Sequence, residues 1–255
     1  MVIVLNKILL FIFTFLIIGD SFKKNTILKN NNSFKSYEKY NVIIYRDTWG
    51  VPHIFGDKDE DTAYGLGYAH AEDDFATIQD ILIAARGNLA KYYGRSVAAN
   101  DYMVKLLKIW DTVEKNYENG LSDDVIKISE AYADGINHYA SLYPDKAFKG
   151  VFPVKGKDIV AGFIHRMPLM FGLDGTLAKL ATNKYPIKNE DPSTSESDIL
   201  NQRMLGSNVI AVSPSRSDDK FTRILINSHQ PWSGPVAWYE AHLNSNEGWN
   251  MVGGL

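Results

Sequence analysis

The sequence predicts an α+β protein, and three observations lead to this prediction. Apolar residues recur at spacings of three and four between residues 59 and 171, which indicates amphipathic helices. Short β-prone runs separated by turn residues follow Gly206. Two further β-prone runs, Asn41–Tyr45 and Val51–Phe55, flank a turn that contains Gly50. The expected order is therefore a hairpin, a mainly helical region and a second group of strands.

The helical region divides into expected helices at about residues 59–93, 101–117, 123–143 and 157–171. Gly94 is the expected stop of the first helix, and Ser122 is the expected N-cap of the third, which ends before Pro144. Pro168 is expected to kink or break the last helix, because proline lacks a backbone N–H and clashes with the preceding turn. The expected buried stripes include Phe75, Ile78, Leu82, Ala85, Leu89 and Tyr92 in the first helix, and Val125, Ile128, Tyr132, Ile136 and Tyr139 in the third.

The strands expected after Gly206 are Ser207–Ser213, Phe221–Asn227, Ala237–Leu243 and Trp249–Gly253. We expect the first two to form an antiparallel hairpin in which Ser207 lies opposite Asn227. His229 would then lie on the same face as Ser207, as a diagonal neighbour at roughly 7–8 Å. A slip of one residue would move His229 to the other face. The last strand would be an unpaired edge, so we expect the sequence to be the N-terminal part of a longer protein.

The composition excludes several classes of protein and site. No cysteine is present, which excludes disulfides, thiolate metal sites and a cysteine nucleophile. The formal net charge is −3, and Lys and Arg are scattered, so the basic surface of a nucleic-acid-binding protein is absent. The sequence contains no G-x-S-x-G, H-E-x-x-H or phosphate-binding glycine motif.

The histidines of the helical region show no metal-ligand spacing. An H-x-E triplet begins at His70, but a zinc deaminase also requires a cysteine pair. His70 is therefore expected on the polar face of a helix. His53, His138 and His165 have no metal-spaced partner and are expected to be structural, and Arg46 and Asp47 are expected to make local polar contacts beside the first turn. No metal or cofactor site is predicted from the residues.

The first 21 residues have the pattern of a signal peptide. Lys7 precedes a run from Ile8 to Ile18 that is apolar apart from Thr14 and is shorter than the roughly 20 residues of a membrane span. We expect export to the periplasm or out of the cell, with an uncleaved signal anchor as the alternative. Residues 22–40 are rich in Asn, Lys and Ser and are expected to be a tether, and residues 184–206 have the composition of a spacer.

Ser207 and His229 form the candidate catalytic pair. A serine nucleophile needs a base, and spacing does not identify the acidic third member of a triad. On spacing alone, a chance occurrence of Ser and His at two strand ends is the simpler interpretation. A cut between Gly206 and Ser207 would supply another base, because Ser207 would then carry a free α-amino group. Such an amine titrates near about pH 7.7–8.0 and is partly neutral at working pH.

Three blocks of sequence resemble one family. They are IYRDTWGVPHIFGDKDEDTAYGLGYAHAEDDF with GNLAKYYG, then GSNVIAVSPSRS, then LINSHQPWSGPVAWYEAHL. Together they resemble the penicillin acylase family of N-terminal-nucleophile hydrolases, and the NSHQPW form is most similar to its acyl-homoserine-lactone and aculeacin acylase branch. The resemblance implies an αββα sandwich that is incomplete here, with a mainly helical α-chain at residues 41–183, a removed spacer at 184–206 and the start of a β-chain at 207–255.

The resemblance also implies roles for particular residues. Ser207 would attack the Gly206 carbonyl, release itself as a new N-terminus and then form an acyl-enzyme, while His229 would orient and polarise it. Asn208 follows the serine as the family pattern expects, in a structural role. Ser228 stands where a proline often precedes the histidine. Candidates for the acyl pocket are Met167, Phe171 and Trp232. The family's oxyanion donors would lie beyond Leu255, and its calcium sites cannot be placed on this sequence.

The function implied by the resemblance is hydrolysis of the amide bond of an N-acylated small molecule, of the acyl-homoserine-lactone type. Two alternatives stay open. One is an acylase for a penicillin or cephalosporin side chain or for a cyclic lipopeptide. The other is a secreted, non-catalytic fragment or binding relic. After processing, the expected partner of the α-chain is the β-chain.

Overall fold

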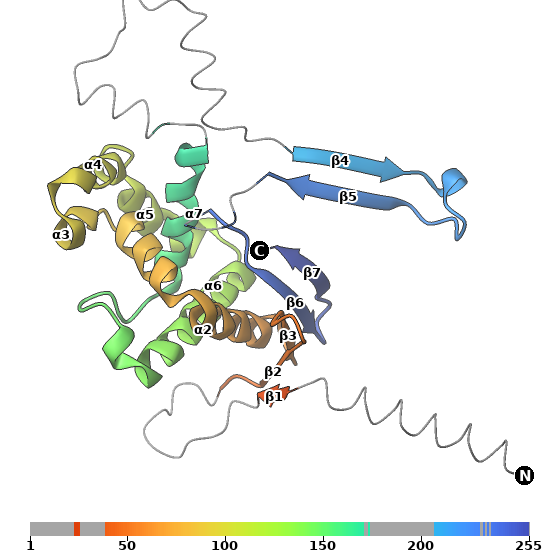
Figure 1. Cartoon of the computed structure of the whole chain (residues 1–255). Coiled ribbons are helices and arrows are strands. Elements are labelled where there is room, and N and C mark those ends of the chain that lie inside the picture. The colour runs from red at the N-terminus through yellow and green to blue at the C-terminus, as the bar shows by residue number, and fades with distance from the viewer. Residues whose placement is uncertain are drawn as a thin grey trace, which may run out of the picture. The chain divides into compact units, whose positions relative to one another are not determined.

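The computed structural model describes residues 23–25, 39–170, 173, 207–229, 232, 234 and 236–254. The expected signal peptide, the spacer, Gly206 and Phe171 lie outside these residues. The chain divides into two compact units, the first formed by Met1–Asp174 with Tyr239–Leu255 and the second by Gly175–Trp238. The first unit contains helices and a sheet, and the second contains a hairpin (Figure 1).

The sheet of the first unit has the strand order β1–β2–β3–β6–β7. Its strands are β1 (Lys23–Asn25), β2 (Val42–Arg46), β3 (Pro52–Gly56), β6 (Glu240–Ser245) and β7 (Asn250–Gly254). The β2–β3 hairpin confirms the first predicted turn, where Gly50 has φ +88°, a conformation that glycine adopts without strain. β3 and β6 pair in parallel, whereas the other neighbours are antiparallel. Residues before and after the predicted spacer therefore share one sheet.

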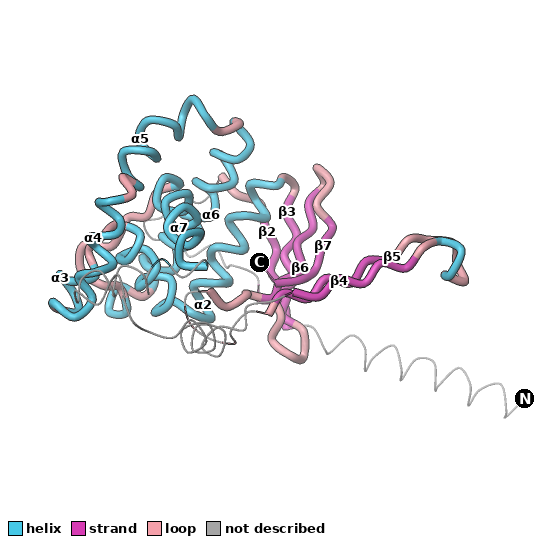
Figure 2. The backbone as a smooth tube through the Cα atoms, turned by 90° about the horizontal axis from the view of Figure 1, so that it is seen from above, coloured by secondary structure: helices cyan, strands magenta, loops and turns pink. Residues whose placement is uncertain are grey.

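One face of this sheet packs against the long helix α2 (Asp59–Ala85), beside which Figure 2 shows β2, β3, β6 and β7 side by side. The residues buried on this face with Ala69 of α2 are Ile44, Ile54, Ala241 and Leu243. Because side chains alternate along a strand, Ile43 and Phe55 lie on the other face, where they are partly exposed. The inner face of the sheet thus forms a core shared by β2, β3, β6 and α2.

The remaining helices are α3 (Leu89–Tyr93), α4 (Ala98–Leu106), α5 (Ile109–Gly120), α6 (Asp123–Leu142) and α7 (Gly156–Met170), with 3-10 turns at Arg95–Val97, Pro144–Lys146 and Pro214–Arg216. The first expected helix is wrong in its length: it ends at Ala85, and Gly87 has φ +65° before α3 begins. The second expected helix is divided at Lys108, which is left-handed. In the described part of the chain, no helix is long and apolar enough to span a membrane.

Two other helix predictions have clear outcomes. Ser122 is the N-cap of α6, and its Oγ accepts a hydrogen bond from the backbone N–H of Val125 at 3.4 Å, as predicted. Pro168 does not end α7 where it stands, because the helix continues to Met170 and the proline lies in its last turn. Within α2, the backbone leaves helical geometry at Asp74 (φ −142°, ψ 55°), which the sequence pattern did not predict.

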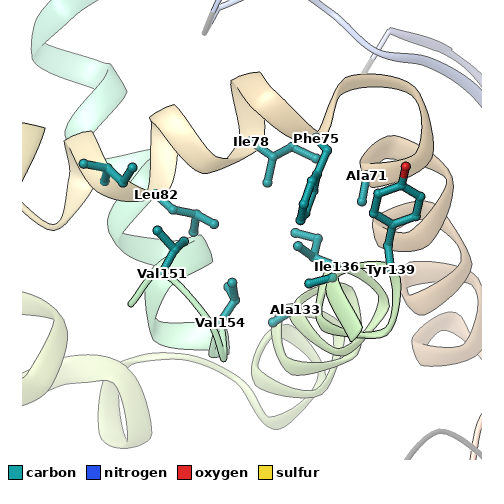
Figure 3. Packing of buried hydrophobic residues seen from close by; sticks show 11 residues of the cluster. Ala71, Phe75, Ile78, Leu82, Ala133, Ile136, Tyr139, Val151 and Val154 are labelled. Atoms are coloured by element: carbon teal, nitrogen blue, oxygen red, sulfur yellow. The ribbon is translucent and has the colours of Figure 1, made fainter. Parts of the chain in front are cut away.

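The main core lies between α2 and α6 (Figure 3). Its members include the predicted stripe residues Phe75, Ile78, Leu82, Ile136 and Tyr139, together with Ala71, Ile83, Ala133, Ala140, Val151 and Val154. Val125 is 43% exposed, so its expected burial is wrong. Gly67 and Gly135 allow the two helix backbones to touch, because a Cβ at either position would lie 2.1 Å from a carbonyl oxygen of the other helix.

The second unit contains the hairpin of β4 (Ser207–Val212) and β5 (Arg223–Ser228). The antiparallel hairpin of these two strands is as predicted. Arg223 Nη1 donates to Asp219 Oδ1 at 2.8 Å and fixes the end of the connecting loop. The hydrogen bonds that Arg223 and Ser217 donate to Asp219 lower the pKa of its carboxyl group. Across the described residues, the chain is α+β as predicted. The two-sheet sandwich stays a prediction.

Candidate active site

Ser207 is the first residue of β4, and it is exposed. β-branched residues favour the extended conformation on both strands of the hairpin, among them Val209 and Ile210 on β4 and Ile224 and Ile226 on β5. The residue opposite Ser207 is Ser228, the last residue of β5. The fold therefore presents the candidate nucleophile at the open end of a two-stranded ribbon.

The predicted register of this hairpin is wrong by one residue. Ser207 pairs with Ser228 and Asn208 pairs with Asn227, so the paired numbers sum to 435. The connecting loop ends with Arg223 opposite Val212, which shifts every pair by one position from the register expected from loop length. A one-residue slip moves His229 from the face of Ser207 to the face of Asn208.

The side chain of Asn208 makes the contact with His229 that the sequence assigned to Ser207. Asn208 Nδ2 and His229 Nε2 are 3.0 Å apart, as expected for diagonal neighbours on one face of an antiparallel pair. With the amide nitrogen as donor, His229 Nε2 is the acceptor and the proton of the neutral ring lies on Nδ1. Asn208 is therefore a site residue whose contact the sequence did not predict, although its position directly after Ser207 was the available signal.

The candidate pocket residues belong to different parts of the chain. Met167 lies on α7 in the first unit and is 55% exposed, and Trp232 lies in the second unit and is fully exposed. Phe171 and Gly206 lie outside the described residues. The structure thus assembles Ser207, Asn208 and His229 and leaves the acyl pocket as a prediction.

A polar network around the first hairpin was only partly predicted. Arg46 donates to Gly50 O at 2.8 Å, which is the expected local contact, and also to Glu72 at 2.7 Å and Asp73 at 2.8 Å on α2. Tyr239 donates to the same Asp73 carboxylate at 2.5 Å from beyond the spacer. This network ties the hairpin turn, α2 and the start of β6 together.

The expectation that His70 lies on a polar helix face is wrong. Its ring stacks on Tyr239 with centroids 4.3 Å apart, and its Nδ1 is 2.6 Å from the Tyr132 hydroxyl. Burial lowers the pKa of His70 to about 4, against the opposing effect of Asp74, so the ring is neutral near pH 7. The other histidines of the helices are structural as predicted, since His165 Nε2 meets Asn100 Oδ1 at 2.7 Å and His138 bonds the Tyr64 hydroxyl.

A hollow of about 520 Å³ lies among the helices of the first unit. Three of its carboxylates already have strong partners: Glu114 pairs with Lys157, Glu130 accepts from Tyr117 and Asp158 pairs with Arg86, at 2.6, 2.8 and 2.7 Å. Such engaged groups stabilise the helices and do not form a free acid–base pair. Among the residues that the structure describes, no three or more His, Asp or Glu side chains form a metal-binding group.

Comparisons with known proteins bear on this site. Acyl-homoserine lactone acylase PvdQ of Pseudomonas savastanoi pv. phaseolicola is 25% identical over 226 residues, which cover 78% of this chain and 29% of the relative. Aculeacin-A acylase of Actinoplanes utahensis is 22% identical over 231 residues, which cover 80% of this chain and 29% of the relative. A solved structure of a thermostable penicillin G acylase from Alcaligenes faecalis has a TM-score of 0.43 and 23% identity, covering 65% of this chain and 92% of the solved chain.

The chain spans about 29% of the length of these curated relatives. A family model described as penicillin amidase matches residues 41–255, a range that contains the three sequence blocks, Ser207, Asn208 and His229. Since this match covers most of the chain, the predicted family is confirmed: the chain belongs to the penicillin amidase family.

Proposed function

We propose that the chain is the first part of an exported acylase precursor that cuts itself between Gly206 and Ser207 and then hydrolyses the amide bond of N-acylated small molecules. The observation that carries this proposal is the family match over residues 41–255, within which Ser207 is the exposed first residue of β4. The names of the relatives, acyl-homoserine lactone acylase and aculeacin-A acylase, support amide hydrolysis as the reaction.

Self-cleavage requires only the Ser207 hydroxyl, the peptide bond between Gly206 and Ser207, and water. Ser207 Oγ attacks the Gly206 carbonyl carbon, the C–N bond breaks, and the acyl group moves to the oxygen as an ester while the α-amine is released. Water then hydrolyses the ester, which leaves a carboxylate on Gly206 and a free hydroxyl on Ser207. The absence of a side chain on glycine leaves this carbonyl unobstructed. The exposure of Ser207 at the end of the hairpin is consistent with access of water.

The mature serine then acts on a substrate with its own amine as the base. The amine accepts the Oγ proton as Oγ attacks the substrate amide carbonyl, and the proton passes to the leaving amine as the acyl-enzyme forms. Water hydrolyses the acyl-enzyme to the free acid. Ser228 pairs with Ser207, and His229 is the next residue. We therefore assign the main chain of His229, and not its imidazole, to the contact with the end of the hairpin that carries Ser207.

The two products of self-cleavage are expected to stay together. β3 precedes the cut and β6 follows it, and their parallel pairing joins His53–Gly56 to His242–Ser245. The polar contacts across the same boundary include Asp59 N–H to Glu247 at 2.8 Å, Thr62 Oγ1 to Asn244 O at 3.1 Å and Tyr239 to Asp73. A shared sheet and a shared core support a heterodimer of α-chain and β-chain.

The substrate that we favour is an N-acyl-homoserine lactone, because two relatives matched over 78% of this chain are named acyl-homoserine lactone acylases. Such a molecule joins an apolar acyl chain to a small polar amine. Met167, Phe171 and Trp232 are the apolar side chains that we assign to the acyl chain. The periplasm or the outside of the cell is the proposed location, in keeping with the predicted signal peptide.

Intact-mass measurement of the purified chain tests self-cleavage. We expect a fragment whose N-terminal residue is Ser207, and we expect the Ser207→Ala variant to remain uncut. Ser213→Ala, directly after the other end of β4, removes a serine hydroxyl away from the cleavage bond and is expected to be cut like the wild type. Cleavage of Ser207→Ala at the wild-type rate, or a wild-type chain that stays intact, would show that Ser207 does not process itself.

Amide hydrolysis is assayed separately, on the protein as its gene encodes it. Release of free homoserine lactone amine from an N-acyl-homoserine lactone is expected for the processed wild type and absent for Ser207→Ala. An enzyme that releases the amine only from a penicillin would favour the β-lactam alternative. Processing without hydrolysis of any N-acyl amide would favour the non-catalytic alternative.

A further inference from the structure

Two histidine rings meet on the outer face of the first-unit sheet. His53 on β3 lies directly opposite His242 on the parallel strand β6, and their Nδ1 atoms are 3.0 Å apart. The ring planes are inclined at 78° with centroids 5.1 Å apart, so the rings meet edge to face and not in a stack. The histidines are 189 residues apart in sequence, so no spacing pattern predicts their meeting.

The other nitrogen of each ring faces an oxygen atom. His53 Nε2 is 3.5 Å from Asp47 Oδ2, and His242 Nε2 is 3.5 Å from Asn250 Oδ1. A carboxylate oxygen only accepts hydrogen bonds, so it favours a proton on Nε2 of His53, and the amide oxygen does the same for His242. With both protons on Nε2, the two Nδ1 lone pairs face each other at 3.0 Å and can bind one cation between them, whereas a proton on either Nδ1 would join the rings by an N–H···N hydrogen bond.

The surroundings hold this arrangement in place. Asp47 Oδ1 accepts backbone N–H groups of Trp49 at 2.8 Å and Val51 at 3.0 Å, which fixes the carboxylate in the hairpin turn. Metal-binding histidines commonly donate their second N–H to a carboxylate or carbonyl in this way, which fixes the tautomer and raises the basicity of the ligand. His53 is 28% exposed at its side chain, so water and ions reach the pair.

The separation of the two nitrogens is close to that of two ligands on one metal ion. Two ligands at about 2.1 Å from a metal ion and at right angles to each other lie about 3.0 Å apart. A tetrahedral angle at the same bond length would separate them by about 3.4 Å. The 3.0 Å distance between the Nδ1 atoms therefore fits adjacent positions of a square-planar or octahedral ion, which are the geometries of Cu²⁺ and Ni²⁺.

We propose that His53 and His242 bind one divalent transition-metal ion of the Cu²⁺ or Ni²⁺ type through their Nδ1 atoms, with water in the remaining positions. The site supplies two protein ligands, and Asp47 and Asn250 orient them from behind. Since β3 precedes Ser207 and β6 follows it, the bound ion links the two segments across the parallel pairing. The proposal concerns this chain as it stands and does not depend on self-cleavage or on amide hydrolysis.

Titration of metal-free protein tests the site. The chain is purified without a histidine tag, freed of chelator, and titrated with NiCl₂ in a calorimeter and with CuCl₂ in an electron paramagnetic resonance spectrometer. In each titration we expect one ion to bind per chain. The copper spectrum is expected to show hyperfine structure from two imidazole nitrogens, and Ni²⁺ is expected to raise the melting temperature. His53→Ala and His242→Ala are each expected to lose at least tenfold in affinity and to lose the melting-temperature shift.

Two further variants separate the site from general histidine binding. His229→Ala removes an exposed histidine elsewhere in the chain and is expected to leave metal affinity unchanged. Asp47→Asn keeps both imidazoles and is expected to weaken binding by about tenfold, as for other outer-shell partners. Circular dichroism without metal shows whether each variant folds. Binding through one nitrogen, unchanged affinity in folded His53→Ala and His242→Ala, or no saturable binding by the wild type would overturn the proposal.

Discussion

At the scale of single residues, the burial of His70 makes the folding stability depend on pH. Its pKa falls from an ordinary 6.5 to about 4 in the fold, chiefly through desolvation. Between these values the unfolded chain binds the proton and the folded chain does not, so stability is lost as the pH falls from about 6.5 to about 4. After allowance for partial exposure, the loss from His70 is on the order of 2 kcal/mol.

Urea unfolding of the wild type and of His70→Gln at several pH values measures this contribution. The wild type is expected to lose more stability than the variant between pH 6.5 and pH 4, while the two curves run parallel above pH 7. His138 and His165 also have lowered pKa values through burial, but they remain in both proteins and cancel in the difference. Equal slopes over the whole range would assign the acid sensitivity to other groups.

The contact of Asn208 with His229 is the residue-scale test of the corrected register. Since the imidazole faces Asn208 and not Ser207, we expect His229→Gln to retain self-cleavage within about tenfold, the effect of one net hydrogen bond. Asn208→Ala is expected to change the tautomer ratio of His229, measured from its ring ¹⁵N chemical shifts. If His229→Gln lost cleavage as completely as Ser207→Ala, the imidazole would have the role that the family resemblance implied, which is to orient and polarise Ser207.

At the scale of elements, two glycines set the distance between α2 and α6. A Cβ added at Gly135 would lie 2.1 Å from the carbonyl oxygen of Tyr64, which cannot move away without displacing the helix. We expect Gly135→Ala to lower the free energy of unfolding by about 2–3 kcal/mol, the usual cost of overpacking a core. Urea denaturation measures the change.

Gly162 in α7 provides the matched control. A Cβ there would meet only Ile81 Cγ2, at 3.9 Å, which is an ordinary contact. Alanine has the higher helix propensity, so Gly162→Ala is expected to raise stability by up to about 1 kcal/mol. If the two substitutions had the same effect, close approach of the helices would not be the reason for Gly135.

The sequence predicted elements with local signals and missed those that depend on particular backbone angles. Ser122 and the stripe of Phe75, Ile78 and Leu82 follow from capping and from the helical period. The breaks at Gly87 and Lys108 depend on single residues with positive φ, for which glycine is a weak signal and lysine is none. The register of β4 and β5 depended on one residue of loop length, and an error of one inverts the faces.

At the scale of the whole molecule, the parallel pairing of β3 with β6 was beyond prediction from one sequence. Both strands were expected individually, but their partners along the chain, β2 and β7, are the ones that local turns indicate. The pairing of Ile54 with Leu243 joins residues far apart in the chain, and no local pattern selects it. For the same reason, the contact of His53 with His242 and the contact of Tyr239 with Asp73 were not predicted.

That pairing leads to a prediction about the chain after a cut. A protease site substituted into residues 184–206 allows the chain to be cut without Ser207, for example in the Ser207→Ala variant. We expect the two pieces to elute together in size-exclusion chromatography, because Leu243 and Ala241 of one piece are buried against Ile44, Ile54 and Ala69 of the other. Separation of the pieces in the absence of denaturant would contradict a shared core.

Leu243→Asp tests which contact holds the pieces together. Leu243 is 2% exposed, so a carboxylate there would be buried without a partner, and we expect the cut pieces to separate. Val252→Asp adds the same charge on the edge strand β7, where Val252 is 68% exposed, and its pieces are expected to stay together. Circular dichroism of the piece that ends in the spacer distinguishes separation from unfolding, since α2 and α6 contribute its main core without β6. If the Leu243→Asp pieces still eluted together, the polar contacts of Glu247, Asn244 and Tyr239 would be the ones that join them.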